Sequence, residues 1–157
     1  MGYVRITDRP EELFHYTRRD NLASILRDGR IKRMGDAECW FCSTLDDTLE
    51  LMRATVMVEG KPYVKLGGSI GRYPKFQPED YVILRLKPRY QNGDWVRWMQ
   101  ELPPGTPLRL LKAAENFSNL KLGFRGDLKF WPEPEIIEVK ALLAPEEIQS
   151  VNLSISM

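Results

Sequence analysis

The hydrophobic pattern predicts a strand followed by a helix near the N-terminus. Apolar and aromatic side chains at Leu13, Phe14 and Tyr16 are typical of a buried strand. We expect Thr17 to begin a helix, because Thr17 and Asp20 have the spacing of a capping box with Asp in place of Glu or Gln. The helix is expected to continue through three apolar positions and to end at a glycine, namely Leu22, Ile25, Leu26 and Gly29.

A second unit of the same kind follows. Residues 37–44 are rich in aromatic residues and cysteine and predict a strand. Thr44 and Asp47 repeat the capping spacing. Apolar residues then fall near one helical face, at Leu45, Leu49, Met52 and Val56. Glycine and proline mark residues 58–76, and we expect their glycine-rich part, residues 67–71, to form a loop.

The second half of the chain gives less regular signals. Trp95, Trp98, Met99 and Leu102 have the i, i+3, i+4, i+7 spacing of a short helix, with the tryptophans in its buried face. Strands are expected at 81–86, 108–112, 135–139 and 151–155, and a helical turn started by proline at 144–148. Helices and strands do not alternate regularly after residue 60, which favours an α+β fold over a doubly wound parallel sheet.

Composition narrows the class of protein. A chain of 157 residues with 43% hydrophobic content is expected to form a single domain, 1–157. The net charge of +1 gives no overall argument for a nucleic-acid or membrane partner. Met1 is followed by polar residues rather than an apolar signal segment, and no apolar run has the length of a membrane span, so we expect a cytoplasmic protein.

Two cysteines, Cys39 and Cys42, stand at C-x-x-C spacing. A zinc site needs four ligands, and the single histidine of the chain, His15, cannot complete one with them. We therefore expect no metal, and two unreactive thiols buried in a strand.

His15 is the first candidate for chemistry, because it lies where the first strand meets its helix. Taken alone, it fits either a hydrogen-bonded core histidine or a ligand contact. The basic segment 30–38 follows, either as a solvated connection or as a phosphate contact beside His15. Near the C-terminus, a glycine-bearing and aromatic loop at 123–134 leads into the strand that begins at Glu135.

The first strand and helix carry a family resemblance. Residues 14–17, 21–22, 24–26, Gly29 and Ile31 resemble the first motif of ADP-ribosyltransferase-fold proteins, most closely the DarT-like bacterial transferases. The sequence of 134–139 followed by 144–148 resembles the terminal strand and helical turn of that group. Residues 58–120 carry no resemblance. The resemblance implies split β-sheets around an NAD cleft with short flanking helices.

The resemblance also implies roles for individual residues. Glu135 would stabilise the positive charge that develops on the ribose when the nicotinamide bond breaks, and His15 would hydrogen-bond a ribose. The remaining NAD contacts would come from Tyr16, Thr17, Phe41, Ser43 and Thr44, with an aromatic ring stacked on nicotinamide. Acceptor contacts would come from Arg125, Trp131 and Glu133. A catalytic arginine is also implied, for which Arg53 and Arg72 are candidates.

The position of the catalytic glutamate stays open between three residues. Glu133 and Glu135 share one face of the predicted strand, and Glu138 points to the other face.

The implied function is a mono-ADP-ribosyltransferase that uses NAD as substrate and modifies DNA, RNA or protein, as a toxin or a factor in phage–host conflict. Two alternatives are a catalytically inactive binding module of the same fold and an RNA 2′-phosphotransferase. The phosphotransferase family surrounds its phosphate with a set of arginines, and the sequence alone does not place such a set.

Overall fold

The computed structural model describes residues 2–6, 9–33, 38–65, 67–99 and 102–143. Its strands are β1 (Gly2–Ile6), β2 (Leu13–Arg18), β3 (Arg30–Ile31), β4 (Cys39–Phe41), β5 (Pro62–Val64), β6 (Ile70–Arg72), β7 (Tyr81–Leu86), β8 (Asp94–Met99), β9 (Leu122–Arg125), β10 (Leu128–Lys129) and β11 (Glu135–Glu138). Its helices are α1 (Leu22–Asp28), α2 (Leu45–Ala54), α3 (Leu108–Asn119) and α4 (Val139–Leu142), with 3-10 turns at Arg19–Asn21 and Pro78–Asp80.

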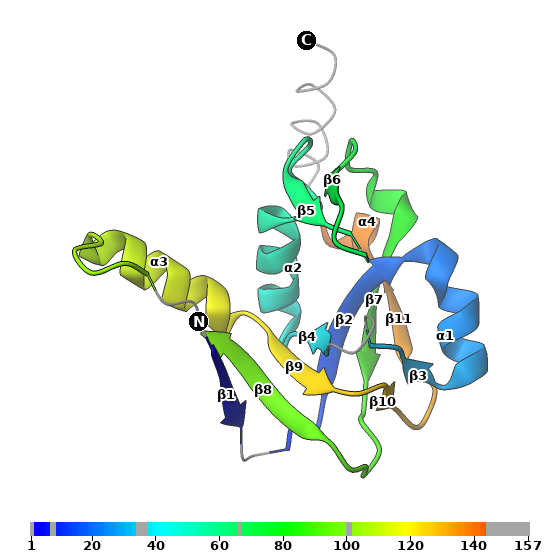
Figure 1. Ribbon diagram of the computed structural model, residues 1–157. Coiled ribbons are helices and arrows are strands. Elements are labelled where there is room, and N and C mark those ends of the chain that lie inside the picture. The colour runs from blue at the N-terminus through cyan, green and yellow to red at the C-terminus, as the bar shows by residue number, and fades with distance from the viewer. Residues whose placement is uncertain (1, 7–8, 34–37, 66, 100–101, 144–157) are drawn as a thin grey trace.

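The strands form several small sheets, and every ladder among them is antiparallel (Figure 1). One sheet has the order β1-β8-β9-β4 and a second has the order β11-β7-β2. The two meet where Phe14 and Cys42 exchange backbone hydrogen bonds of 2.8 Å in both directions. The antiparallel ladders with few helices confirm an α+β protein.

The sheet β11-β7-β2 carries hydrophobic packing on both faces, because neighbouring residues of β2 and β7 point in opposite directions. Leu13, Val82 and Leu84 pack on one face with Phe41 and the other members of the first cluster, Trp95, Phe124 and Leu128. On the other face, Phe14 and Ile83 pack against Met52 of α2 and Val139 of α4. The central strand β7 is therefore buried from both sides, which fixes the position of β2 and its histidine.

The helix predicted at 95–102 is wrong, because residues 94–99 form strand β8. β8 lies between two partners, with Trp95 opposite Ile6 of β1 and Phe124 of β9. Aromatic residues suit a pleated sheet, and the local spacing does not distinguish this strand from a helix. Trp95 is buried, as expected.

Three other predictions need correction. The strand expected at 108–112 is the first part of α3. The loop expected at 67–71 is shorter than predicted, because β6 already begins at Ile70 and pairs with β5. Thr17 does not begin a helix: it belongs to β2, and α1 begins at Leu22 after a 3-10 turn.

Other local predictions are confirmed. Gly29 ends α1 in the left-handed conformation, with φ 65°. The Thr44 hydroxyl caps α2 by accepting a hydrogen bond from the Asp47 backbone N–H at 3.0 Å. Strands β4 and β7 lie within or at their predicted ranges, and β11 begins at Glu135 as expected but ends one residue early. The turn expected at 144–148 and the strand expected at 151–155 lie outside the described residues. Within the described part of the chain, no helix has both the length and the apolarity to cross a bilayer.

Candidate functional site

His15 lies on β2 beside a polar cavity of about 230 Å³. The cavity is bounded by the end of β2, the helix α1 and the strand β3. Its lining residues are His15, Thr17, Asn21, Ser24, Ile25, Asp28, Arg30, Ile31 and Lys32. A cavity of this volume lies below the usual range for whole small-molecule ligands and suits one sugar or one ring of a larger ligand.

The hydrogen bonding of His15 fixes its tautomer. Nδ1 lies 2.9 Å from the backbone carbonyl oxygen of Trp40. A carbonyl oxygen only accepts, so Nδ1 carries the proton and Nε2 carries a lone pair. Burial lowers the pKa of His15 below its ordinary value of 6.5, against the smaller opposing effect of the Trp40 carbonyl. The ring is therefore neutral at pH 7, and its Nε2 can accept a hydrogen bond.

Thr17 is the second predicted residue that the structure brings to this cavity. It lies two residues after His15 on β2, so both side chains point to the same face of the sheet. The Thr17 hydroxyl oxygen accepts a hydrogen bond of 3.1 Å from the side-chain amide of Asn21. Asn21 thus orients Thr17 toward the corner between strand and helix.

Two predicted aromatic contacts do not lie in the cavity. Tyr16 points to the opposite face, where its hydroxyl lies 3.3 Å from the Thr55 hydroxyl and where burial raises its pKa to about 12. Phe41 is close to His15, with ring centroids 5.3 Å apart, but it is 1% exposed and belongs to the hydrophobic core. Phe41 therefore packs against the imidazole from the side of the hydrophobic core and is too buried to stack on a ligand.

Ser43 and Thr44 are exposed and lie between β4 and α2. The Thr44 hydroxyl is engaged at the N-terminus of α2. Neither residue lines the cavity that contains His15.

The sheet separates the candidate glutamates by face. Glu135 lies opposite Arg85 of β7, which lies opposite Phe14 of β2, so these three share one face. Glu138 lies opposite Val82, which lies opposite Thr17, so Glu138 lies on the face of Thr17 and His15. Two strand spacings, about 10 Å, separate the backbones of Thr17 and Glu138. The structure brings Glu138, and not Glu135, to the face that carries the histidine.

Ion pairs hold both glutamates in place. A carboxylate oxygen of Glu135 lies 3.5 Å from Arg85 Nη1, and Arg85 also binds Glu12. Arg19, just beyond Thr17, donates to the Glu138 carboxylate and lowers its pKa. Glu138 is therefore kept ionised at the same end of β2 as the cavity.

The other predicted contacts lie elsewhere. Glu133 and Trp131 are exposed in the segment between β10 and β11, with Trp131 at 72% exposure. Arg125 is exposed at the end of β9, opposite Asp94. The two candidate arginines pair locally: Arg53 with Glu50 at 2.9 Å, and Arg72 with the Gly60 carbonyl at 2.9 Å.

Sequence reasoning missed the acidic residue of the cavity, Asp28. Its carboxylate lies 3.2 Å from Arg27 and 3.3 Å from Lys32, and these two cations hold its pKa below the usual range. Asp28 stands at the C-terminal end of α1, just before Gly29, so the helix-stop signal marked its position without indicating a ligand contact.

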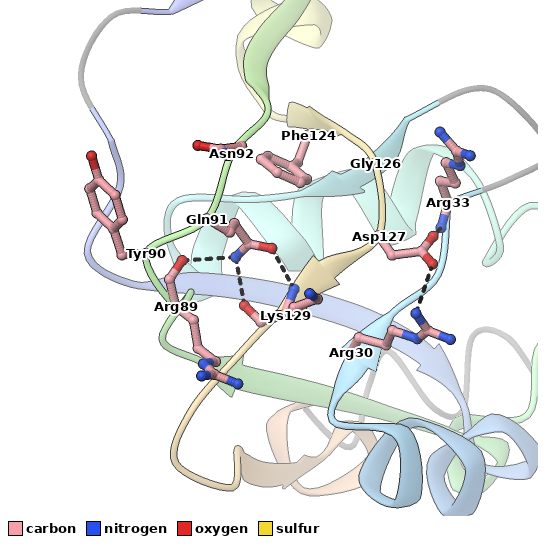
Figure 2. A pocket seen from close by; sticks show the side chains of 10 residues that line it. All are labelled: Arg30, Arg33, Arg89, Tyr90, Gln91, Asn92, Phe124, Gly126, Asp127 and Lys129. Carbon is pink, nitrogen blue, oxygen red and sulfur yellow. Dashed lines mark hydrogen bonds and ion pairs between the residues drawn. The ribbon is translucent and has the colours of Figure 1, made fainter.

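A larger cleft of about 530 Å³ shares one lining residue, Arg30, with this cavity. Figure 2 shows the residues that line this larger cleft. Its basic lining residues are Arg30, Arg33, Arg89 and Lys129. Asp127 is the one acidic side chain among the described residues of the lining. Arg89 and Lys129, from distant parts of the chain, thus join Arg30 and Arg33 in this lining.

Both cysteines are buried free thiols. Burial raises the pKa of Cys39 to about 12 and that of Cys42 to about 11, so neither is a thiolate at neutral pH. The expectation of two buried, unreactive thiols is confirmed in burial and in the direction of both pKa values.

Comparisons of the chain with protein-family models, with curated proteins and with solved structures find no match.

Proposed function

We propose that the protein is an NAD-dependent mono-ADP-ribosyltransferase with its ribose-binding corner at His15 and Thr17. The observation that carries the proposal is the neutral His15 ring, whose Nδ1–H is fixed on Trp40 while the ring lines a polar cavity. A ribose hydroxyl is a matching donor for the free Nε2 lone pair. The His-aromatic-Thr motif that resembles the transferase family lies at this corner, which supports the same proposal.

The proposed reaction consists of the departure of nicotinamide and the attack of an acceptor on the ribose. The bond between the ribose C1′ and the nicotinamide nitrogen breaks, and its electron pair leaves with neutral nicotinamide. A hydroxyl, amino or water nucleophile then forms the new bond to C1′ and gives up its proton. Positive charge on the ribose is greatest between these events, so an ionised carboxylate nearby lowers the barrier.

Glu138 is the carboxylate that we assign to this role. It shares the sheet face of His15 and Thr17, and Arg19 keeps it ionised. Both carboxylates are ion-paired: Asp28, which lines the cavity, with Arg27 and Lys32, and Glu138, which does not line it, with Arg19 alone. We choose Glu138 because a single cation neutralises less of its charge than two cations neutralise of Asp28. Glu135 belongs to the opposite face with Arg85.

NAD binding tests the histidine directly. We expect saturable binding of NAD by the wild type in isothermal titration calorimetry, and a loss of about tenfold in affinity for His15→Asn, the value of one hydrogen bond. The Asn amide can still donate to the Trp40 carbonyl, so the fold keeps that contact. Tyr16→Phe is the matched control: it lies next to His15 on the opposite face and should bind NAD as the wild type does. Equal affinity of all three proteins, or no binding by any, would refute the proposal.

A second candidate is an RNA 2′-phosphotransferase-like enzyme. The observation that favours it is that Arg30, Arg33 and Arg89 line one cleft, which shares Arg30 with the His15 cavity, since the resemblance to that family implies an arginine set around a phosphate. Loss of the 2′-phosphate from an RNA oligonucleotide, with transfer of that phosphate to the ADP-ribose part of NAD and release of nicotinamide, would establish this activity. Binding of NAD with neither nicotinamide release nor phosphate transfer would instead support the inactive binding module.

A further inference from the structure

The amine of Lys121 lies on two aromatic rings. Lys121 stands between α3 and β9, and its Nζ is 4.9 Å from the ring centroid of Trp40 and 5.4 Å from that of Phe117. Among the described residues, no other lysine lies over an aromatic ring. The amine is therefore held between β4 and the last turn of α3, on apolar surfaces.

The position of the Trp40 ring depends on a glycine. Trp40 pairs with Gly123 of β9, and a Cβ at position 123 would lie 3.0 to 3.2 Å from three atoms of the indole ring. Glycine thus allows the Trp40 ring to lie against β9, where it supports Lys121 from one side. Phe117, 36% exposed, contacts Lys121 from α3.

No carboxylate compensates the charge of Lys121. Within the described part of the chain, Lys121 forms no ion pair. Cys42 nearby is a buried thiol, and Arg97 donates to the backbone carbonyls of Asn119 at 3.0 Å and Lys121 at 3.5 Å. Burial lowers the pKa of Lys121, against a smaller opposite effect of Cys42. The ring faces attract the ammonium, but they do not replace the hydrogen bonds that water gives it.

These surroundings favour nucleophilic chemistry at Lys121. A neutral primary amine attacks carbonyl carbons, whereas an ammonium has no lone pair to do so. Groups that disfavour the ammonium therefore increase the fraction of reactive amine at neutral pH. Lys121 is only half-buried, so a small electrophile can reach its Nζ.

We propose that Lys121 is a site of covalent acylation by small acyl thioesters, because the Trp40 and Phe117 rings hold its amine away from water. Nζ attacks the thioester carbonyl carbon and forms a C–N bond, while the C–S bond breaks and its electron pair leaves with the sulfur. The nitrogen gives up one proton, which the released thiolate or water takes up. The product is a neutral amide, so the positive charge between β4 and α3 is lost. The reaction does not involve NAD and is independent of the proposed transferase.

The test compares the acetylation of two lysines in one sample. The full-length protein is incubated with acetyl-coenzyme A over a range of pH, and acetylation of each lysine is measured by peptide mass spectrometry. Lys112 is the internal reference, because it is exposed on α3. We expect Lys121 to react at least about threefold faster than Lys112 at about pH 7.5. Lys121 should also reach half of its maximal rate at a lower pH than Lys112.

Phe117→Ala tests the contribution of the rings. It opens one side of the amine to water, so the half-maximal rate of Lys121 should move to higher pH, and its rate at about pH 7.5 should come within about twofold of that of Lys112. Leu110→Ala is the matched control, since it removes another exposed apolar side chain from α3 and should change neither value.

Three results would overturn the proposal. The first is that Lys121 reacts no faster than Lys112, and the second is that its half-maximal rate occurs at the same or a higher pH. The third is that Phe117→Ala leaves the profile of Lys121 unchanged or has the same effect as Leu110→Ala. Nicotinamide release is measured in a separate assay without acetyl-coenzyme A, so failure of the transferase proposal is seen independently.

Discussion

His15 shows how one side chain acquires a defined chemical state from its surroundings. The Trp40 carbonyl accepts a hydrogen bond from Nδ1–H, Phe41 packs against the ring, and burial lowers the pKa of His15. These contacts come from β4, whose position depends on the backbone bonds between Phe14 and Cys42. A neutral imidazole in fixed orientation is the property that the proposed ribose contact requires.

The lowered pKa of His15 predicts a pH dependence of stability. The unfolded chain has an ordinary histidine that binds a proton near pH 6.5, whereas the folded chain resists protonation until a lower pH. The unfolded state therefore gains more protons as the pH falls, and folding loses stability below about pH 6.5. We expect the urea midpoint of the wild type to decrease as the pH is lowered from about 7.5 to about 5.5. His15→Asn should show a flatter profile, and an equal slope in both proteins would contradict the assignment.

At the scale of elements, local signals predicted the ends of helices better than the identity of strands. Gly29 and Thr44 act within one turn of their own helices, so their neighbours in sequence determine what they do. β8 depends on partners far away in the sequence, Ile6 and Phe124, which no local spacing reveals. The strand–helix corner at His15 was predicted, but the extra turn at Arg19–Asn21 shifted the helix start, because Thr17 stays paired with Val82.

The variant Thr44→Ala tells whether Thr44 caps helix α2 or contacts NAD. Thr44→Ala should lower the free energy of unfolding by about 1 kcal/mol, since it leaves the Asp47 N–H without its partner at the start of α2. Chemical denaturation measures this loss, with Ser43→Ala as the exposed neighbour that should change little. We expect NAD affinity to be unchanged in both variants. A loss of NAD affinity in Thr44→Ala alone would indicate that Thr44 contacts NAD.

At the scale of the whole molecule, β7 connects the two hydrophobic clusters. Leu84 and Val82 contribute to one cluster, and Ile83 and Tyr81 to the other. The clusters therefore share one strand, and the loss of packing on either face weakens the support of the site on β2. The basic cleft is a property of the same scale, because Arg89 and Lys129 reach Arg30 only after β3 and β10 pair. The sequence identified the basic segment 30–38, but it did not indicate that Arg89 and Lys129 lie beside it.

Leu84→Ala tests this central role. Leu84 is fully buried, and its truncation should cost about 2–5 kcal/mol of unfolding free energy. Ile136→Ala is the matched control, because Ile136 is paired directly opposite Leu84 on the same face but is 42% exposed. It should cost clearly less in the same urea titration. Similar losses for the two variants would show that burial on β7 does not dominate the stability of this sheet.

The most direct test of the account is nicotinamide release from NAD by wild type, Glu138→Gln and Glu135→Gln, measured by mass spectrometry with water as the acceptor. We predict release by the wild type and by Glu135→Gln, and a reduction of about 10²–10³ for Glu138→Gln, the usual effect of removing one positioned electrostatic group. The two variants lose the same charge from opposite faces of one strand. Release that survives in Glu138→Gln and fails in Glu135→Gln would contradict the assignment, and no release by the wild type would contradict the transferase itself.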